Sequence, residues 1–164
     1  MKQVTCVRHG DALPWPSGGS DFDRRLSEHG ELQVARLAVA LRGRKFQPEF
    51  VLASAAPRAL RTAELLCEGL QLPPAALHPD RCFYEHGLEA ALEQLWGLRE
   101  ELHSVLLVAH HPTMSALPAW LTGTGLDALG TAEAVSVELA IGRWQEAQAG
   151  CGTLLWRIGP PGEL

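Results

Sequence analysis

Cysteine is scarce in this sequence, and its distribution indicates neither a disulfide framework nor a metal cluster. The four cysteines are scattered without a C-x-x-C pair, at Cys6, Cys67, Cys82 and Cys151. Cys6 and Cys67 fall in apolar segments, where we expect buried thiols rather than disulfides. The doublet His110-His111 suggests a metal, but no third ligand accompanies it at metal spacing. We therefore expect a protein that uses no metal and no other cofactor.

Long apolar runs, a leader segment and an excess of positive charge are also missing. No apolar run approaches membrane-spanning length, and residues 1–3 lead straight into an apolar segment without room for a signal peptide. We expect a cytoplasmic protein without a membrane partner. The formal net charge of -5 argues against nucleic acid as the main partner. Arginines nevertheless outnumber lysines heavily, so a local basic pocket remains compatible with this charge.

The clearest chemical signal is a short apolar run that begins at Val4 and stops at Arg8-His9-Gly10. The run predicts a buried β-strand, and open α/β sheets place ligand crevices at the carboxyl ends of such strands. Arginine offers a planar fork of donors to phosphate oxygens, and a neutral imidazole is a nucleophile. The pattern predicts a phosphoryl-transfer site in which His9 attacks. Taken alone, Arg-His-Gly is a weak three-residue match and is more often a strand end with a capped histidine.

Strand and helix patterns alternate along the rest of the chain. Strands are expected at residues 50–54, near 77, at 104–109, at 135–141 (half-buried, by its alternation) and at 153–158. Four helices are expected: from the N-cap Ser27 to Gly43, from Pro57 onward, over Leu88–Leu102, and from Pro112 onward. The buried face of the helix that begins at Pro57 is expected to consist of Leu60, Ala63, Cys67 and Leu70. Residues 80–87 read as irregular, and residues 159–162 as a frayed end.

This order predicts one α/β domain spanning residues 1–164. We expect a three-layer sandwich, with a mainly parallel central sheet, helices on both faces and a C-terminal antiparallel hairpin. Three strand-to-helix junctions, which carry Arg8-His9, Arg58 and His110, would then share one edge of the sheet. Arg58 has a second interpretation, as a solvated arginine on the surface.

Convergence of these groups suits the chemistry of phosphoryl transfer. The transition state carries charge on three equatorial oxygens, which two arginines and one protonated histidine would neutralise. The attacking histidine must be neutral at the nitrogen that faces phosphorus, with its other N–H held by an acceptor. Glu85, just before the helix at residue 88, either bends into this pocket or favours the helix N-terminus.

Four segments resemble the histidine phosphatase superfamily, the phosphoglycerate mutase-like family, and within it the short phosphohistidine phosphatases of the SixA type. They are RHGDA at residues 8–12, RRLSEHG at 24–30, SAAPRALRT at 54–62 and VAHHP at 108–112. The resemblance implies that His9 is transiently phosphorylated and that Arg8, Arg58 and His110 form the phosphate pocket. It places Glu85 roughly where larger members carry a proton donor.

The sequence departs from the family pattern at three positions. Ala55 stands where the family has proline, Ala109 where it has glycine, and His111 where it has asparagine. The two alanines are compatible with the junctions they occupy. His111 lies beside the expected pocket and is a candidate for substrate contact.

The leaving group favours one substrate class over the other. Cleavage of the P–N bond in phosphohistidine expels an imidazole, which protonates near neutral pH, whereas an alkoxide requires a well-placed general acid. No long insertion that would cap the pocket is apparent. We therefore expect a phosphohistidine-bearing signalling protein as substrate. The alternatives are a small-molecule phosphomonoesterase that uses Glu85 as general acid and, from another class, a non-catalytic phosphate-binding module.

Overall fold

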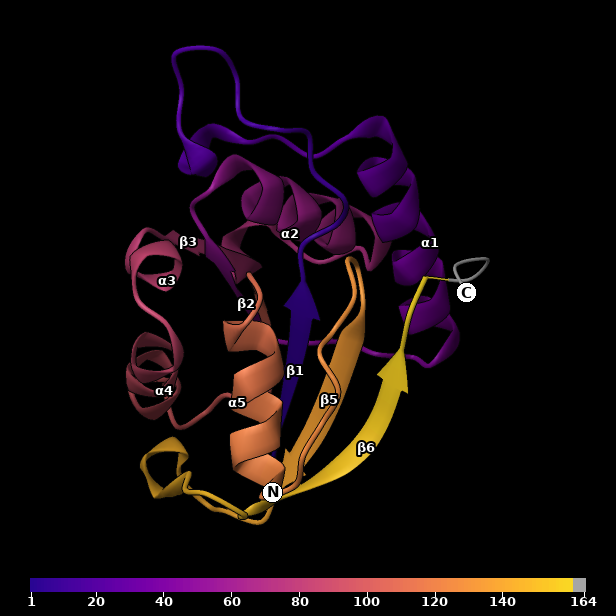
Figure 1. Ribbon diagram of the computed structural model, residues 1–164. Helices are drawn as coiled ribbons and strands as arrows, with labels where there is room; N and C mark the ends of the chain where they lie inside the picture. Colours follow the sequence, from indigo (N-terminus) through magenta and orange to yellow (C-terminus); the bar gives the residue numbers. More distant parts are fainter. Residues whose placement is uncertain (161–164) are drawn as a thin grey trace.

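The computed structural model describes residues 1–160, so residues 161–162 of the expected frayed end lie outside the described part. Its centre is a six-stranded sheet with the order β3-β2-β4-β1-β5-β6 (Figure 1). The strands are β1 (Lys2–Arg8), β2 (Phe50–Ser54), β3 (Leu77–Asp80), β4 (Ser104–Ala109), β5 (Ala134–Leu139) and β6 (Gly152–Ile158). β3, β2, β4 and β1 are parallel, whereas β5 and β6 form an antiparallel pair. The predicted sheet and C-terminal hairpin are confirmed.

Helices cover both faces of this sheet. The helices are α1 (Glu28–Gly43), α2 (Pro57–Gly69), α3 (Cys82–Glu85), α4 (Leu88–Trp96) and α5 (Thr113–Thr122), with short 3-10 turns η1 (Asp21–Asp23), η2 (Pro74–Ala76) and η3 (Trp144–Glu146). α1 and α2 pack together on one face, and α4 and α5 on the other (Figure 1). No helix among residues 1–160 has the length and apolar character needed to cross a membrane.

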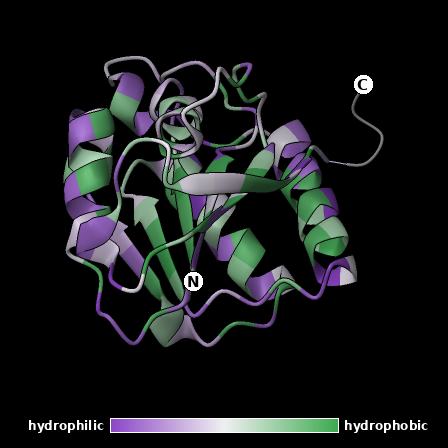
Figure 2. Cartoon of the chain, turned by 90° about the horizontal axis from the view of Figure 1, so that it is seen from below, coloured by the Kyte–Doolittle hydropathy of each residue, from purple (hydrophilic) through white to green (hydrophobic). Residues whose placement is uncertain are grey.

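Two hydrophobic cores follow from the alternation of side chains along the strands. Val7, Val51 and Val108 point toward α1 and α2, whereas Cys6 and Leu107 point toward α4 and α5. Both faces of β2 and β4 are covered, and these two parallel strands are apolar apart from one terminal serine each, as is common in α/β proteins. Figure 2 shows the hydrophobic residues concentrated on the strands and on the helix sides turned toward them.

The end of the chain differs from its predicted half-buried pattern. The alternation around β5 predicts one solvated face, but Ser136 is fully buried and Glu138 alone in the strand is partly exposed. The Ser136 hydroxyl accepts hydrogen bonds from Thr5 and Gln3 of β1. A hydroxyl that has hydrogen-bond partners costs little to bury, so a polar residue in this strand does not mark a solvent-exposed face.

Two helices also differ in detail from their predictions. α4 ends at Trp96, and Leu102 lies beyond it, buried at the start of the approach to β4. In α2, Leu60 is only half-buried, while Arg58 and Thr62 are buried in the face that meets the sheet edge. Residues 82–85 of the predicted irregular stretch form the single turn α3.

Candidate active site

His9 lies directly after β1, beside the end of the neighbouring strand β4. Its backbone N–H donates to the carbonyl of Ala109 at the end of β4, at 3.0 Å, and its side chain is only 7% exposed. The parallel pairing of β1 with β4 and of β4 with β2 brings three strand ends to one edge. Arg8, His9, Arg58 and His110, which the sequence places at three separate junctions, meet there around one cavity of 340 Å³.

The hydrogen bond to His9 determines which of its nitrogens carries a proton. Nδ1 lies 2.7 Å from the carbonyl oxygen of Gly10. A carbonyl only accepts, so Nδ1 is the donor and Nε2 keeps its lone pair. Burial lowers the pKa of His9 to about 4, and the charges of Arg58 and Arg8 act in the same direction, against the hydrogen bond to Gly10. The imidazole is therefore neutral at neutral pH, as an attacking group must be.

His110, across the cavity, is held by a serine at the end of β2. Its Nε2 lies 2.8 Å from the Ser54 hydroxyl, and its ring centroid lies 5.2 Å from that of His9. Burial lowers the pKa of His110 to about 3, with the charges of His9 and Arg58 also lowering it. Burial beside arginines thus disfavours a further cation at His110, whereas a protonated histidine in the transition state is expected from the sequence.

The two arginines are fixed by oxygen atoms of the protein. Arg58, which is 4% exposed, donates from Nη1 to the backbone carbonyl of Asp21 at 2.7 Å and from Nη2 to its carboxylate at 2.9 Å. Arg8 donates from Nη1 to the carbonyl of Leu129 at 3.0 Å. Burial in the first turn of α2 excludes the interpretation of Arg58 as a solvated surface residue.

Three buried nitrogen atoms at the cavity have no hydrogen-bond partner within residues 1–160. They are Nε of Arg8, Nε of Arg58 and Nδ1 of His110. Leaving a buried polar group unpaired is costly, so such groups are rare, and a catalytic role or a bound water or ion is a common explanation. Two of these nitrogens belong to positively charged guanidinium groups, and all three side chains line the same cavity. Together they form a site suited to an anion with several oxygen atoms.

Asp21 and Tyr84 also belong to this site, although the sequence reasoning did not select them. Asp21 lines the cavity, and the Tyr84 hydroxyl donates to its carboxylate at 2.9 Å. The Tyr84 ring meets the His110 ring edge-on at a centroid distance of 5.3 Å. Asp21 begins the short turn η1, in a part of the sequence without regular pattern, so no local signal marks it. Tyr84 is the only tyrosine of the chain, and its position next to Glu85 was the one hint that the sequence offered.

Glu85 and His111 occupy different kinds of position. Glu85 is exposed on α3, its carboxylate accepts from Nε of Arg81 at 2.9 Å, and it is absent from the described lining of the His9 cavity. α3 turns Tyr84 toward the cavity instead. His111 is exposed, lines the cavity, and lies 3.4 Å from the Ser115 hydroxyl through Nδ1.

Thr62 joins the loop after β1 to α2. The Gly10 N–H donates to the Thr62 hydroxyl at 3.1 Å, and this hydroxyl donates to the carbonyl of Arg58 at 2.7 Å. Gly10 has no room for a side chain, because a Cβ there would lie 2.9 Å from the carbonyl of Gly30 in α1. The segment that carries His9 is thus locked between two helices.

Ser27 begins α1 and ties it to the same loop. Its side chain caps the helix by accepting from the N–H of Gly30 at 2.9 Å, as predicted. The Ser27 hydroxyl also donates to the Asp11 carboxylate at 2.6 Å. Asp11 lines the cavity, so the start of α1 helps to shape its wall.

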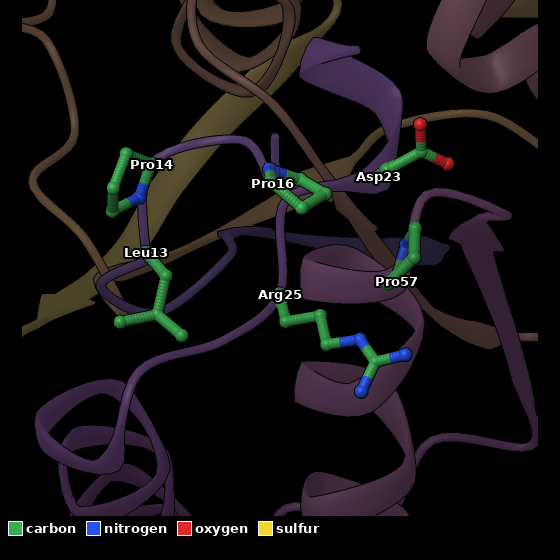
Figure 3. Close-up of a pocket in the computed structure, with 6 residues that line it drawn as sticks. All are labelled: Leu13, Pro14, Pro16, Asp23, Arg25 and Pro57. Carbon is green, nitrogen blue, oxygen red and sulfur yellow. The ribbon is translucent and has the colours of Figure 1, made fainter. Parts of the chain in front are cut away.

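A second hollow lies between the loop after β1 and the start of α2. Its volume is 260 Å³. Figure 3 shows its lining, which combines four apolar residues with two charged ones: Leu13, Pro14, Pro16, Pro57, Asp23 and Arg25. Leu13 and Trp15 on this loop are 49% and 59% exposed. Arg24 lines both the His9 cavity and a further hollow with Pro14 and Trp15, so these two hollows meet at Arg24.

Comparison with known proteins assigns the chain to a family. Residues 4–87 match the histidine phosphatase superfamily (branch 1). The chain is 32% identical over 164 residues to the phosphohistidine phosphatase SixA of Escherichia coli, covering 96% of this chain and 94% of that protein. A solved structure of the protein histidine phosphatase SixA with tungstate superimposes with a TM-score of 0.82 and 30% identity, covering 96% of this chain and 97% of that one.

The same fold occurs in a phosphatase that acts on a small molecule. A mycobacterial glucosyl-3-phosphoglycerate phosphatase superimposes with a TM-score of 0.66 and 18% identity, over 94% of this chain and 97% of that one. The fold is thus shared by phosphatases whose names indicate different substrates. The family match, the SixA relative and the shared fold together show that this chain is a phosphatase and belongs to the histidine phosphatase superfamily.

Proposed function

We propose that this protein hydrolyses phosphohistidine on a partner protein, without a metal, through a phosphorylated His9. One observation carries the proposal. The unprotonated Nε2 of His9 belongs to a cavity whose other walls supply three unpaired buried nitrogens, from Arg8, Arg58 and His110. This combines a nucleophile with fixed donors for the oxygens of a phosphoryl group.

The first step transfers the phosphoryl group to His9. Nε2 attacks phosphorus, a new P–N bond forms, and the P–N bond to the partner's imidazole breaks with its electron pair. The other ring nitrogen of the partner's imidazole takes a proton from solvent before or as this bond breaks, so that the group leaves as neutral imidazole. This protonation is accessible near neutral pH, because the ordinary pKa of an imidazole is about 6.5. Arg8, Arg58 and His110 hold the three equatorial oxygens. Catalysis here rests on position and charge, as is general for phosphoryl transfer.

The second step returns His9 to its starting state. Water attacks the phosphorus of phospho-His9, the P–N bond breaks, and its electron pair returns to Nε2. Inorganic phosphate leaves with the proton that the water loses. The hydrogen bond from Nδ1 to Gly10 persists through both steps, so that the imidazole needs no reorientation.

Two features favour a protein substrate over a small phosphate ester. The exposed side chains of Leu13 and Trp15 beside the cavity offer an apolar surface to residues that flank a phosphohistidine. Glu85, the expected general acid for an ester, pairs with Arg81 outside the cavity. The name of the SixA relative agrees with this substrate class.

Metal-free release of phosphate tests the proposal. A phosphohistidine-bearing protein domain is compared with small phosphate esters, and His9→Ala serves as the blank. We expect release from the protein domain to be faster by orders of magnitude and to vanish in the variant. Trp15→Ser should slow release from the protein domain but not from phosphoramidate. A preference for esters would favour the phosphomonoesterase, and binding without turnover would favour the phosphate-binding module.

A further inference from the structure

Asp21 is a carboxylate inside a pocket that is built for an anion. Its Oδ2 accepts from Nη2 of Arg58 and from the hydroxyl of Tyr84, each at 2.9 Å, and Oδ1 lies 3.4 Å from Nη1 of Arg24. Burial raises the pKa of Asp21, but hydrogen bonds from Tyr84 and the charge of Arg58 outweigh it, so the pKa lies below its ordinary value. Asp21 is therefore ionised at neutral pH.

The contacts of Arg58 divide its guanidinium into two edges. The edge formed by Nη1 and Nη2 is taken by the backbone carbonyl and the carboxylate of Asp21. The other edge consists of Nε, which is buried without a partner within residues 1–160, and the second N–H of Nη2. A guanidinium binds oxygen pairs along either edge. Asp21 and a phosphoryl group therefore fit on Arg58 at the same time.

The surroundings hold Asp21 at this place. Phe22, the next residue in η1, packs edge-on against Tyr84 at a centroid distance of 4.9 Å, and the Arg81 guanidinium lies over Phe22 at 4.6 Å. The carboxylate is thus anchored by packing between η1 and α3 in addition to its hydrogen bonds. An anion that enters the cavity meets it as a fixed charge.

The charged residues that line the cavity affect how tightly it binds free phosphate. The described cavity lining has three arginines (Arg8, Arg24 and Arg58) and two carboxylates, Asp11 and Asp21. Three arginines alone would also retain the inorganic phosphate that each turnover produces. A fixed negative charge on one arginine weakens the hold on any free dianion. A partner protein compensates for this loss by its contacts with the apolar loop, whereas free phosphate has no such contacts.

We propose that Asp21 is a specificity-determining residue: it stays on the Nη1–Nη2 edge of Arg58 and lowers the affinity of the pocket for free phosphate, so that tight binding requires the further contacts that a partner protein makes outside the pocket. The inference rests on the proposed function, because it takes Arg8, Arg58 and His110 as the phosphate pocket. It predicts that removal of one negative charge strengthens phosphate binding. A residue that only positions Arg58 would weaken binding when it is changed.

Calorimetric titration with inorganic phosphate tests this inference without any turnover. Asp21→Asn keeps an oxygen for Nη2 of Arg58 and removes the charge, so the Kd for phosphate should fall about tenfold. Glu31→Gln is the matched control, because Glu31 also pairs with an arginine, Arg61 at 3.3 Å, but is absent from the described cavity lining. Its Kd should stay within about twofold of the wild-type value.

The remaining outcomes separate this inference from the proposed function. An equal or higher Kd in the folded Asp21→Asn protein, with phosphate bound by the wild type, overturns the role of Asp21 alone. An absence of phosphate binding to both proteins overturns the phosphate pocket as well. As a second measurement, phosphate should inhibit turnover by Asp21→Asn at about one-tenth of the concentration needed for the wild type. Unchanged inhibition would contradict the inference.

Discussion

The Ser54 hydroxyl and Nε2 of His110 lie 2.8 Å apart, and this contact sets what His110 presents to the cavity. Ser54 also accepts from the N–H of Ala56 at 3.2 Å, so its own proton is free to donate to Nε2. Nδ1 of His110 then carries the N–H, and it is this nitrogen that lacks a partner within the described residues. A serine at the end of β2 thereby prepares a donor for a phosphate oxygen.

Ser54→Ala should therefore impair catalysis without loss of the fold. Removal of the hydroxyl leaves Nε2 unpaired and no longer selects the tautomer with the proton on Nδ1. We expect kcat/KM to fall about tenfold, in line with the loss of one buried hydrogen bond. The measurement is steady-state turnover together with urea unfolding. Unchanged turnover in a folded variant would show that Ser54 does not orient His110.

Gly30 and Gly43 form a matched pair within α1. A Cβ on Gly30 would collide with the backbone carbonyl of Asp11, whereas a Cβ on Gly43 would meet nothing within 4 Å. Gly30→Ala should lower the free energy of unfolding by about 2 kcal/mol and reduce activity, because Asp11 lines the cavity. Gly43→Ala should be neutral or stabilise by up to about 1 kcal/mol. Equal effects in chemical denaturation would contradict the close approach at Gly30.

The stability of the protein should depend on pH through His9, which is buried, and His110, which is partly buried. The pKa values of His9, about 4, and His110, about 3, lie below the value near 6.5 of an unfolded chain. The unfolded state therefore binds more protons, so stability is complete above pH 6.5 and declines as the pH falls toward 4.

His110→Gln isolates one share of this dependence. Between pH 7 and pH 4.5, the free energy of unfolding of the variant should fall by about 2 kcal/mol less than that of the wild type, as measured by urea unfolding at each pH. His103→Gln, which changes an exposed histidine, is the control and should follow the wild type. If His110→Gln has the wild-type slope, His110 titrates normally and is not held neutral.

The placement of these side chains shows how far sequence reasoning reaches. Arg8, His9, Arg58 and His110 were predicted to converge because parallel strands end at one edge, a rule that needs only the strand order. β2 and β4 have the predicted bounds because their apolar runs are uninterrupted. The cap at Ser27 follows from local chemistry in the same way.

The residues that were missed depend on contacts between distant segments. Asp21 reaches Arg58 because the loop after β1 folds back over α2, and no periodicity encodes that path. α3 directs Tyr84 inward and leaves Glu85 with Arg81, a choice that one helical turn makes and composition does not. The buried Ser136 is likewise explained only by its partners on the neighbouring strand.

Glu85→Gln tests which residue of α3 matters. Because Glu85 is exposed and pairs with Arg81, we expect turnover of phosphohistidine to change by less than about twofold. Turnover of small alkyl phosphates is measured in parallel. A large loss on alkyl phosphates alone would assign Glu85 as general acid and favour the phosphomonoesterase.

The most direct test of the account is a search for the phosphorylated enzyme. The protein is mixed with a phosphohistidine-bearing domain, quenched in alkali at short times, and analysed by intact mass and peptide mapping. We predict one phosphoryl group that appears and decays on His9, and none in His9→Ala. Phosphate released at the normal rate without any phosphoryl group on His9 would contradict the account, because water would then attack the substrate directly.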